Sequence, residues 1–160
     1  MTYHVRVRPT ALIIENDSML LVEYKDEEGI HYNLPGGGAE PGETMIEGVQ
    51  RELFEETMAD AEVGPIAFVY ECAPHKQSGD YPDTTPHTLY LIFDCTLKEG
   101  SRPRQPDVTD ANQSAVKWIP LQELDSIILF PNIKPQIKEY IRNRRSIEII
   151  QDFQLERYFN

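Results

Sequence analysis

The sequence predicts an α/β sandwich, in which helices cover a β-sheet, and the order of its hydrophobic patterns is the main reason. Strand-like runs come first, a helical pattern follows, further strand-like runs come next, and a second helical pattern lies near the C-terminus. Elements in this order bury their apolar faces as packed layers. With 160 residues, of which 40% are hydrophobic, we expect one domain spanning residues 1–160, with a core of its own.

Apolar runs that are rich in β-branched residues and bounded by turn residues predict the strands. A short strand at residues 3–8 is expected to stop at Pro9, and residues 10–14 and 19–24 form a hairpin around the turn at residues 15–18. The further predicted strands are residues 31–34, 62–72 with an interruption at Gly64-Pro65, 87–97, and 114–119, in which Trp118 is expected to be a core residue. Two connections, 73–86 and 98–112, are long for a compact domain, which is typical of functional loops.

Helical spacing of apolar residues predicts two helices, residues 44–57 and 131–144. The first has an apolar stripe made of Met45, Ile46, Val49 and Leu53, and the second has one made of Ile133, Ile137, Tyr140 and Ile141. Residues 147–159 fit a helix and a strand equally, and the stretch 146–160 is expected to pack either on its own domain or across a dimer.

The composition excludes several classes of partner. A net charge of −12 argues against non-specific binding to nucleic acid or to an anionic membrane. No apolar run approaches the length of a membrane span, and the N-terminus has no apolar signal core, so we expect a cytoplasmic location. Cys72 and Cys95, the two cysteines, are expected to be buried thiols, with a disulfide as the alternative.

Three glutamates near the end of the first helix conflict with ordinary helix chemistry. Glu52, Glu55 and Glu56 lie at the C-terminal end, where the helix dipole disfavours negative charge, and Glu52 and Glu56 repel each other as i,i+4 neighbours. Glu56 also projects beside the apolar stripe, where an unpaired carboxylate is costly. A bound cation would offset these costs, whereas the plain alternative is a solvated acidic face.

The residues around these glutamates resemble a known family. Gly37, five residues, Glu43, seven residues and then Arg-Glu-Leu-Phe-Glu-Glu at 51–56 are similar to the Nudix box of the Nudix hydrolases. A chance match in a chain of this size is on the order of one in a million. Met58 stands where the family has glycine, so we expect the helix to run on for a few residues or to end by another route. Ala59 replaces a larger aliphatic residue, and the box covers 23 of the 160 residues.

The resemblance implies the Nudix fold, a mixed β-sheet sandwiched between α-helices, and a metal site. By this resemblance, the side chains of Glu52, Glu55 and Glu56 and the backbone carbonyl of Gly36 ligate metal. Oxygen ligands of this kind suit Mg²⁺, for which Mn²⁺ is a common substitute. The sequence has no Cys/His cluster for zinc.

Further site residues are expected beside the metal ligands. Arg51 is expected to orient Glu43 and the other glutamates, or else to form a surface ion pair with Glu47. The general base is one of the helix glutamates or an acid on a later loop. The loop position that carries a glutamate in many relatives falls near Asn112, so Asp110 is the nearest substitute, both as a metal ligand and as a base; its alternative is a plain loop aspartate.

The family resemblance implies attack of water on a pyrophosphate linkage. Gly37 and Gly38 leave room for a substrate phosphate, and Tyr81 is a candidate to stack on a base. The implied substrate is a small nucleotide, a nucleoside diphosphate linked to another group, with ADP-ribose as the first compound to test. The alternatives are a nucleoside triphosphate pyrophosphohydrolase and a ligand-binding protein that has lost the chemistry. A homodimer is left open.

Overall fold

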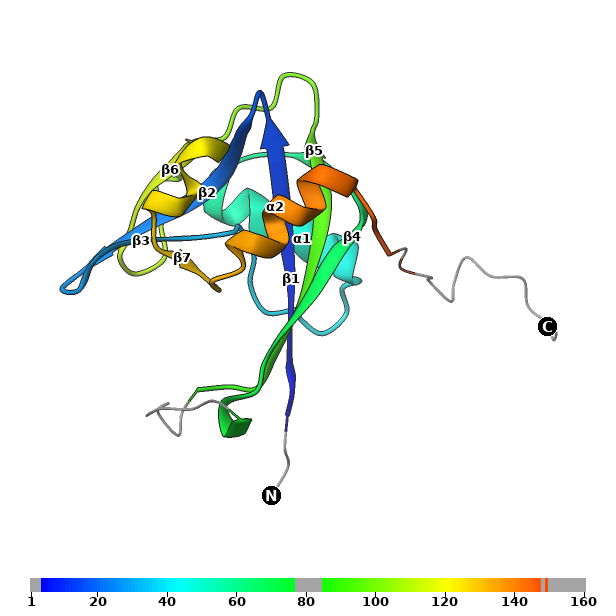
Figure 1. The fold of residues 1–160 in the computed structure, drawn as a ribbon. Helices are drawn as coiled ribbons and strands as arrows, with labels where there is room; N and C mark the ends of the chain where they lie inside the picture. The colour runs from blue at the N-terminus through cyan, green and yellow to red at the C-terminus, as the bar shows by residue number, and fades with distance from the viewer. Residues whose placement is uncertain (1–3, 77–84, 148, 150–160) are drawn as a thin grey trace.

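The computed structural model describes residues 4–76, 85–147 and 149, and Figure 1 shows their arrangement. The strands are β1 (Arg6–Glu15), β2 (Ser18–Asp26), β3 (Gly29–Asn33), β4 (Ala61–Cys72), β5 (Thr88–Leu97), β6 (Gln113–Pro120) and β7 (Leu129–Phe130). The helices are α1 (Met45–Thr57) and α2 (Lys134–Asn143), with short 3-10 turns η1 (Pro74–Lys76) and η2 (Leu121–Ser126).

The sheet is mixed, as the resemblance implied. Its order is β4-β5-β1-β2-β3-β7, with β6 paired to β2. The pairs β1–β5 and β3–β7 are parallel, and the other pairs are antiparallel. The strands β1 and β2 pair only next to their turn, at Ile14↔Met19 and Glu15↔Ser18, and then diverge (Figure 1). The sheet therefore consists of two halves that separate beyond this hairpin.

The helices cover opposite faces of the sheet, as alternation along β1 demonstrates. Leu12 belongs to the core cluster that contains Ile137 and Tyr140 of α2. Its neighbours Ala11 and Ile13 belong to the second cluster, which contains Val49 and Leu53 of α1. Successive residues of a strand point to opposite faces, so the molecule has three layers, and the predicted α/β sandwich is confirmed.

The predicted strand break at Pro9 is wrong, because β1 continues through this residue. Proline is tolerated there because its missing N–H lies on the edge that faces the glycine-rich segment. On that edge Ala11 N donates to Pro35 O at 2.8 Å and Ala39 N donates to Val7 O at 2.9 Å. The other edge pairs with β5. A proline in a strand is acceptable where no ladder bond is required of its nitrogen.

Helix α1 begins and ends with specific caps. Thr44 accepts a hydrogen bond from Glu47 N and the Glu47 side chain accepts one from Thr44 N, which is a complete capping box. The helix ends at Met58, which has the left-handed conformation (φ 58°, ψ 17°) and donates its N–H to Phe54 O. The expectation that α1 runs on or ends by another route is therefore wrong, because Met58 adopts the backbone conformation that glycine would supply.

Other predictions differ in detail. The strand β4 is continuous, but its register with β5 shifts between Val63 and Ile66, where the sequence predicted an interruption. Trp118 is 37% exposed and is not a core residue, and β7 was not predicted. Cys72 and Cys95 are free thiols, as expected; Cys95 is buried as predicted, whereas Cys72 is only partly buried. Among the described helices, none has both the length and the apolarity to cross a membrane.

Candidate active site

The site forms where β1 and β2 diverge. Residues 35–39 pass beside β1 there, and Thr10 and Gly36 form an isolated antiparallel bridge. Gly36 is required at this bridge, because a Cβ on it would lie 2.8 Å from Pro9 O and 2.7 Å from the Thr10 hydroxyl. The C-terminal end of α1 approaches the same segment and brings Glu56 to Gly36.

Glu56 is a buried acid, 4% exposed, in the wall between α1 and the sheet. One of its carboxylate oxygens accepts a hydrogen bond from Gly36 N at 2.9 Å, and the other accepts one from the Tyr24 hydroxyl at 3.2 Å. Burial raises the pKa of Glu56 to about 7, although the Gly36 hydrogen bond and the charge of Arg8 act in the opposite direction. The carboxyl group can therefore exchange a proton near neutral pH.

Arg51 orients the other acids of α1. It donates two hydrogen bonds to the Glu43 carboxylate at 2.8 and 2.9 Å, one to Glu52 at 2.7 Å and a longer one to Glu55 at 3.3 Å. The bonds from Arg51 lower the pKa of Glu43 to about 2, and they raise the pKa of Arg51 itself. The Glu47 carboxylate accepts the Thr44 N–H in the capping box. The alternative prediction, a surface ion pair between Glu47 and Arg51, is therefore wrong.

The glycine turn provides close approach to these side chains. A Cβ at Gly37 would lie 2.3 Å from a carboxylate oxygen of Glu52, and a Cβ at Gly38 would lie 2.7 Å from Nε of Arg6. The Gly38 carbonyl accepts a hydrogen bond from Arg51 at 3.1 Å. The backbone of this turn thus lies in contact with charged side chains, and a side chain at Gly37 or Gly38 would displace Glu52 or Arg6.

A pocket of about 500 Å³ opens over this turn. Its lining includes Glu52 and Glu55 from α1, Asp110 from the 98–112 loop, and Arg6 and Arg8 from β1. The predicted residues Glu52, Glu55 and Asp110 are therefore brought to one cavity, and the negative charges of Glu52 and Asp110 both raise the pKa of Glu56 beside it.

The remaining predicted residues have different positions. Gly36 and Gly37 line the pocket, whereas Glu43 lies behind Arg51. Tyr81 lies outside the described residues. Sequence reasoning missed several lining residues, namely Arg6, Arg8, Tyr24, His31 and Asn33. The available signal was an alternating Arg-x-Arg in a strand-like stretch of an acidic chain.

Comparison with known proteins identifies the family. The family model of the NUDIX domain matches residues 5–143. The chain belongs to the NUDIX family. It is 32% identical to the nucleoside triphosphatase NudI of Enterobacter sp. (strain 638) over 124 residues, which cover 74% of this chain and 84% of that protein. As a member of this family, the chain is a Nudix hydrolase.

Solved structures of NUDIX proteins share the fold. A NUDIX hydrolase from Nitrosomonas europaea superposes with a TM-score of 0.70 at 22% identity, covering 97% of this chain and 98% of that one. An ADP-ribose pyrophosphatase from Streptococcus suis superposes with a TM-score of 0.64 at 23% identity, covering 89% and 94%. At these identities the likeness extends to the fold.

The donor atoms of this Nudix site fit a divalent cation in type. They are carboxylate and carbonyl oxygens, which hard cations such as Mg²⁺ prefer. Within the described ranges, however, no three acidic, histidine or cysteine side chains lie together as a preformed cluster. The contacts explain this, because Arg51 holds Glu52 and Glu55 while Glu56 turns inward to Gly36. A bound cation would have to compete with Arg51 for these carboxylates.

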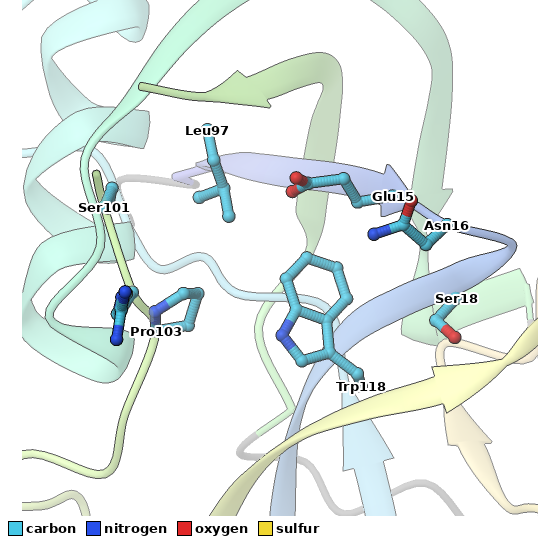
Figure 2. Close-up of a pocket in the computed structure, with 8 residues that line it drawn as sticks. Glu15, Asn16, Ser18, Leu97, Ser101, Pro103 and Trp118 are labelled. Carbon is cyan, nitrogen blue, oxygen red and sulfur yellow. The ribbon is translucent and has the colours of Figure 1, made fainter. Parts of the chain in front are cut away.

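A second cavity lies away from the acids. It has a volume of about 360 Å³, and Figure 2 shows Trp118 facing the space between the β1–β2 turn and the segment that follows Leu97. Glu15 supplies the acidic side chain of its lining. This explains the exposure of Trp118, because the indole forms the wall of a pocket. A single carboxylate does not suit a divalent cation, so the pocket over the glycine turn is the candidate for the active site.

Proposed function

We propose that this Nudix hydrolase is a pyrophosphohydrolase of small nucleotides that depends on a divalent cation, Mg²⁺ or Mn²⁺. The observation that carries the proposal is the buried Glu56 carboxylate, which bonds to Gly36 N at 2.9 Å beside a pocket that Glu52 and Glu55 also line. A buried acid whose pKa is raised, beside a cavity that further carboxylates line, is typical of a catalytic site.

The residues of the chain have distinct roles in this proposal. Glu56 accepts the proton of the attacking water, since its pKa of about 7 suits a base at neutral pH. Glu52, Glu55 and the Gly36 carbonyl hold the cation, with Asp110 as a further ligand, and Arg51 with Glu43 positions the carboxylates. When bound, the cation supplies neutralisation of phosphate oxygens and acidification of water.

For the substrate, we propose nucleoside triphosphates first, because NudI, a relative with 32% identity, is named a nucleoside triphosphatase. The sequence alone favoured ADP-ribose. That compound remains the second candidate, and the fold shared with an ADP-ribose pyrophosphatase supports it.

Product analysis distinguishes the two classes. The purified chain is incubated with Mg²⁺ or Mn²⁺ and a panel of nucleoside triphosphates and ADP-ribose. A triphosphate cleaved at its inner linkage gives a monophosphate and pyrophosphate, whereas ADP-ribose gives AMP and ribose 5-phosphate. A chelator should abolish turnover. If neither class is hydrolysed with either cation, the proposal is wrong, and the non-catalytic binding protein becomes the better explanation.

A further inference from the structure

Two arginines from one strand reach the active-site pocket. Arg6 and Arg8 both line it, and both lie on β1. Residues two apart on a strand project from the same face, so the strand presents two positive charges side by side. They face a pocket whose other charged lining residues are acids, Glu52, Glu55 and Asp110.

These two arginines differ from Arg51 in their partners. Arg51 lies within 4 Å of the carboxylates of Glu40, Glu43, Glu52 and Glu55. Arg6 and Arg8, by contrast, form no ion pair with any residue that the structure describes. In a chain with a net charge of −12, two guanidinium groups at a pocket with no described carboxylate within 4 Å are available to an anionic ligand.

Arg8 is held in place by neutral groups. Its guanidinium donates a hydrogen bond to the Gly36 carbonyl at 2.7 Å and lies over the Tyr90 ring, 5.3 Å from its centre. Its Nε is buried without a hydrogen-bond partner in the described part of the chain. An unpaired buried donor is costly, so the groups around Arg8 do not fully satisfy its guanidinium. The side chain is thus fixed while no described carboxylate lies within 4 Å of it.

The glycine turn joins the arginines to the acids. The Arg6 guanidinium lies against Gly38, and the Glu52 carboxylate lies against Gly37, the preceding residue. An anionic ligand that lies across this turn would therefore face the guanidinium groups of the protein at one of its ends and the carboxylates of the protein at the other. Phosphates suit the first end directly, because the planar guanidinium donates two parallel hydrogen bonds to phosphate oxygens.

We propose that Arg6 and Arg8 form a subsite for the phosphate chain of a nucleoside polyphosphate. The inference rests on the proposed function and extends it, because it assigns recognition of the phosphate chain to β1, outside the Nudix box. The two arginines stand two residues apart on β1, about 6.6 Å along a strand, so a chain of phosphates meets both guanidinium groups whereas a single phosphate meets one. The subsite therefore favours triphosphates and contributes little to binding of monophosphates.

Calorimetric titration tests this proposal with ligands that resist cleavage at the inner linkage. The probes are the α,β-methylene analogues of ATP and GTP, with AMP and GMP for comparison, all in the presence of Mg²⁺. The variants are Arg6→Gln, Arg8→Gln and Arg6→Lys, and Arg145→Gln is a matched control that removes one exposed arginine elsewhere. We expect Arg6→Gln and Arg8→Gln to weaken binding of the triphosphate analogues by about tenfold or more and of the monophosphates by less than threefold.

The controls separate charge from folding. Arg6 is exposed, so Arg6→Gln should fold even if Arg8→Gln is destabilised by loss of the Gly36 contact. Arg6→Lys should lie between wild type and Arg6→Gln, and Arg145→Gln should bind both ligand classes as wild type does. Equal weakening for both ligand classes, unchanged affinity in both Gln variants, or no affinity of wild type for the analogues would overturn the subsite.

The result is independent of turnover. A wild-type chain that hydrolyses nucleotides, with arginine variants that bind the analogues normally, would refute the subsite and leave the proposed function intact. A chain that binds the analogues through Arg6 and Arg8 but hydrolyses nothing would refute the proposed function instead.

Discussion

Glu56 combines burial with negative charge, and the fold creates this combination by bringing the end of α1 against Gly36. If Glu56 is the base, Glu56→Gln should lower the hydrolysis rate by about 10³-fold. The amide oxygen can still accept the Gly36 hydrogen bond, so the variant should remain folded. Steady-state kinetics and thermal denaturation measure the two effects, and Glu62→Gln, at an exposed site on β4, serves as the control.

The affinity for nucleotide separates an enzyme from a ligand-binding protein. A sensor would have no measurable turnover before or after the change and would bind nucleotide equally in both forms. If Glu56→Gln retains the wild-type rate, the base is another residue, and Asp110 becomes the next one to replace.

The raised pKa of Glu56 also predicts a dependence of stability on pH. Burial moves this pKa from 4.5 to about 7, so the folded state binds a proton more tightly than the unfolded state does. The stability that this protonation contributes is complete below pH 4.5 and is lost as the pH rises through 7. The shift of about 2.5 pKa units corresponds to roughly 3 kcal/mol.

Urea denaturation with a chelator, between pH 5 and 8, measures this dependence. The free energy of unfolding of wild type should fall across this range relative to that of Glu56→Gln. Glu43 does not interfere, because its pKa is lowered to about 2, below the window. Parallel curves for the two proteins would show that Glu56 ionises in the folded protein as it does in water.

At the scale of the element, the end of α1 uses a methionine in a conformation that favours glycine. Met58 has φ 58°, and a left-handed L-residue costs about 1–2 kcal/mol. Met58→Gly should therefore be more stable than Met58→Ala by about 1 kcal/mol, since the two variants differ mainly in backbone preference. Chemical denaturation of both variants isolates this difference. If Met58→Ala is the more stable variant, the left-handed cap is not strained.

Both helices and most strands were predictable from the sequence, because each has an apolar face with the period of its secondary structure. The backbone conformations at Pro9 and Met58 were not predictable, because each depends on neighbouring parts of the structure and not on the preference of the residue itself. Pro9 faces an edge that needs no ladder bond from it, and Met58 takes a left-handed cap that the sequence assigned to glycine.

The residues of the candidate site also fall into a group that the sequence predicted and a group that it did not. The residues on the α1 side follow from spacing along one helix, so Glu52, Glu55 and Glu56 could be named from the sequence. Arg8 donates to Gly36 and Tyr24 donates to Glu56, and they come from β1 and β2, which have diverged at this point. No spacing in the sequence encodes that contact, and the Arg-x-Arg alternation at Arg6 and Arg8 is the one local pattern that accompanies it.

At the scale of the whole molecule, a net charge of −12 opposes the compact state, and part of that charge lies at one pocket. A divalent cation that binds there should stabilise the folded protein, by about 2.7 kcal/mol at a hundredfold excess over its Kd. Thermal denaturation should therefore show a Tm that rises with Mg²⁺ or Mn²⁺ and returns to its starting value with chelator.

The pH dependence of this stabilisation identifies the site. A cation held by Glu52 and Glu55 lies beside Glu56 and disfavours its protonation, so the rise in Tm should shrink as the pH falls through about 7, the pKa of the Glu56 carboxyl. Glu52→Gln, which removes a proposed ligand, should lose most of the rise, whereas Glu62→Gln should retain it. A rise that is equal at pH 6 and 8, or that persists in Glu52→Gln, would mean that the cation binds to dispersed surface acids. In that case the pocket over the glycine turn would need another explanation for its excess of carboxylates.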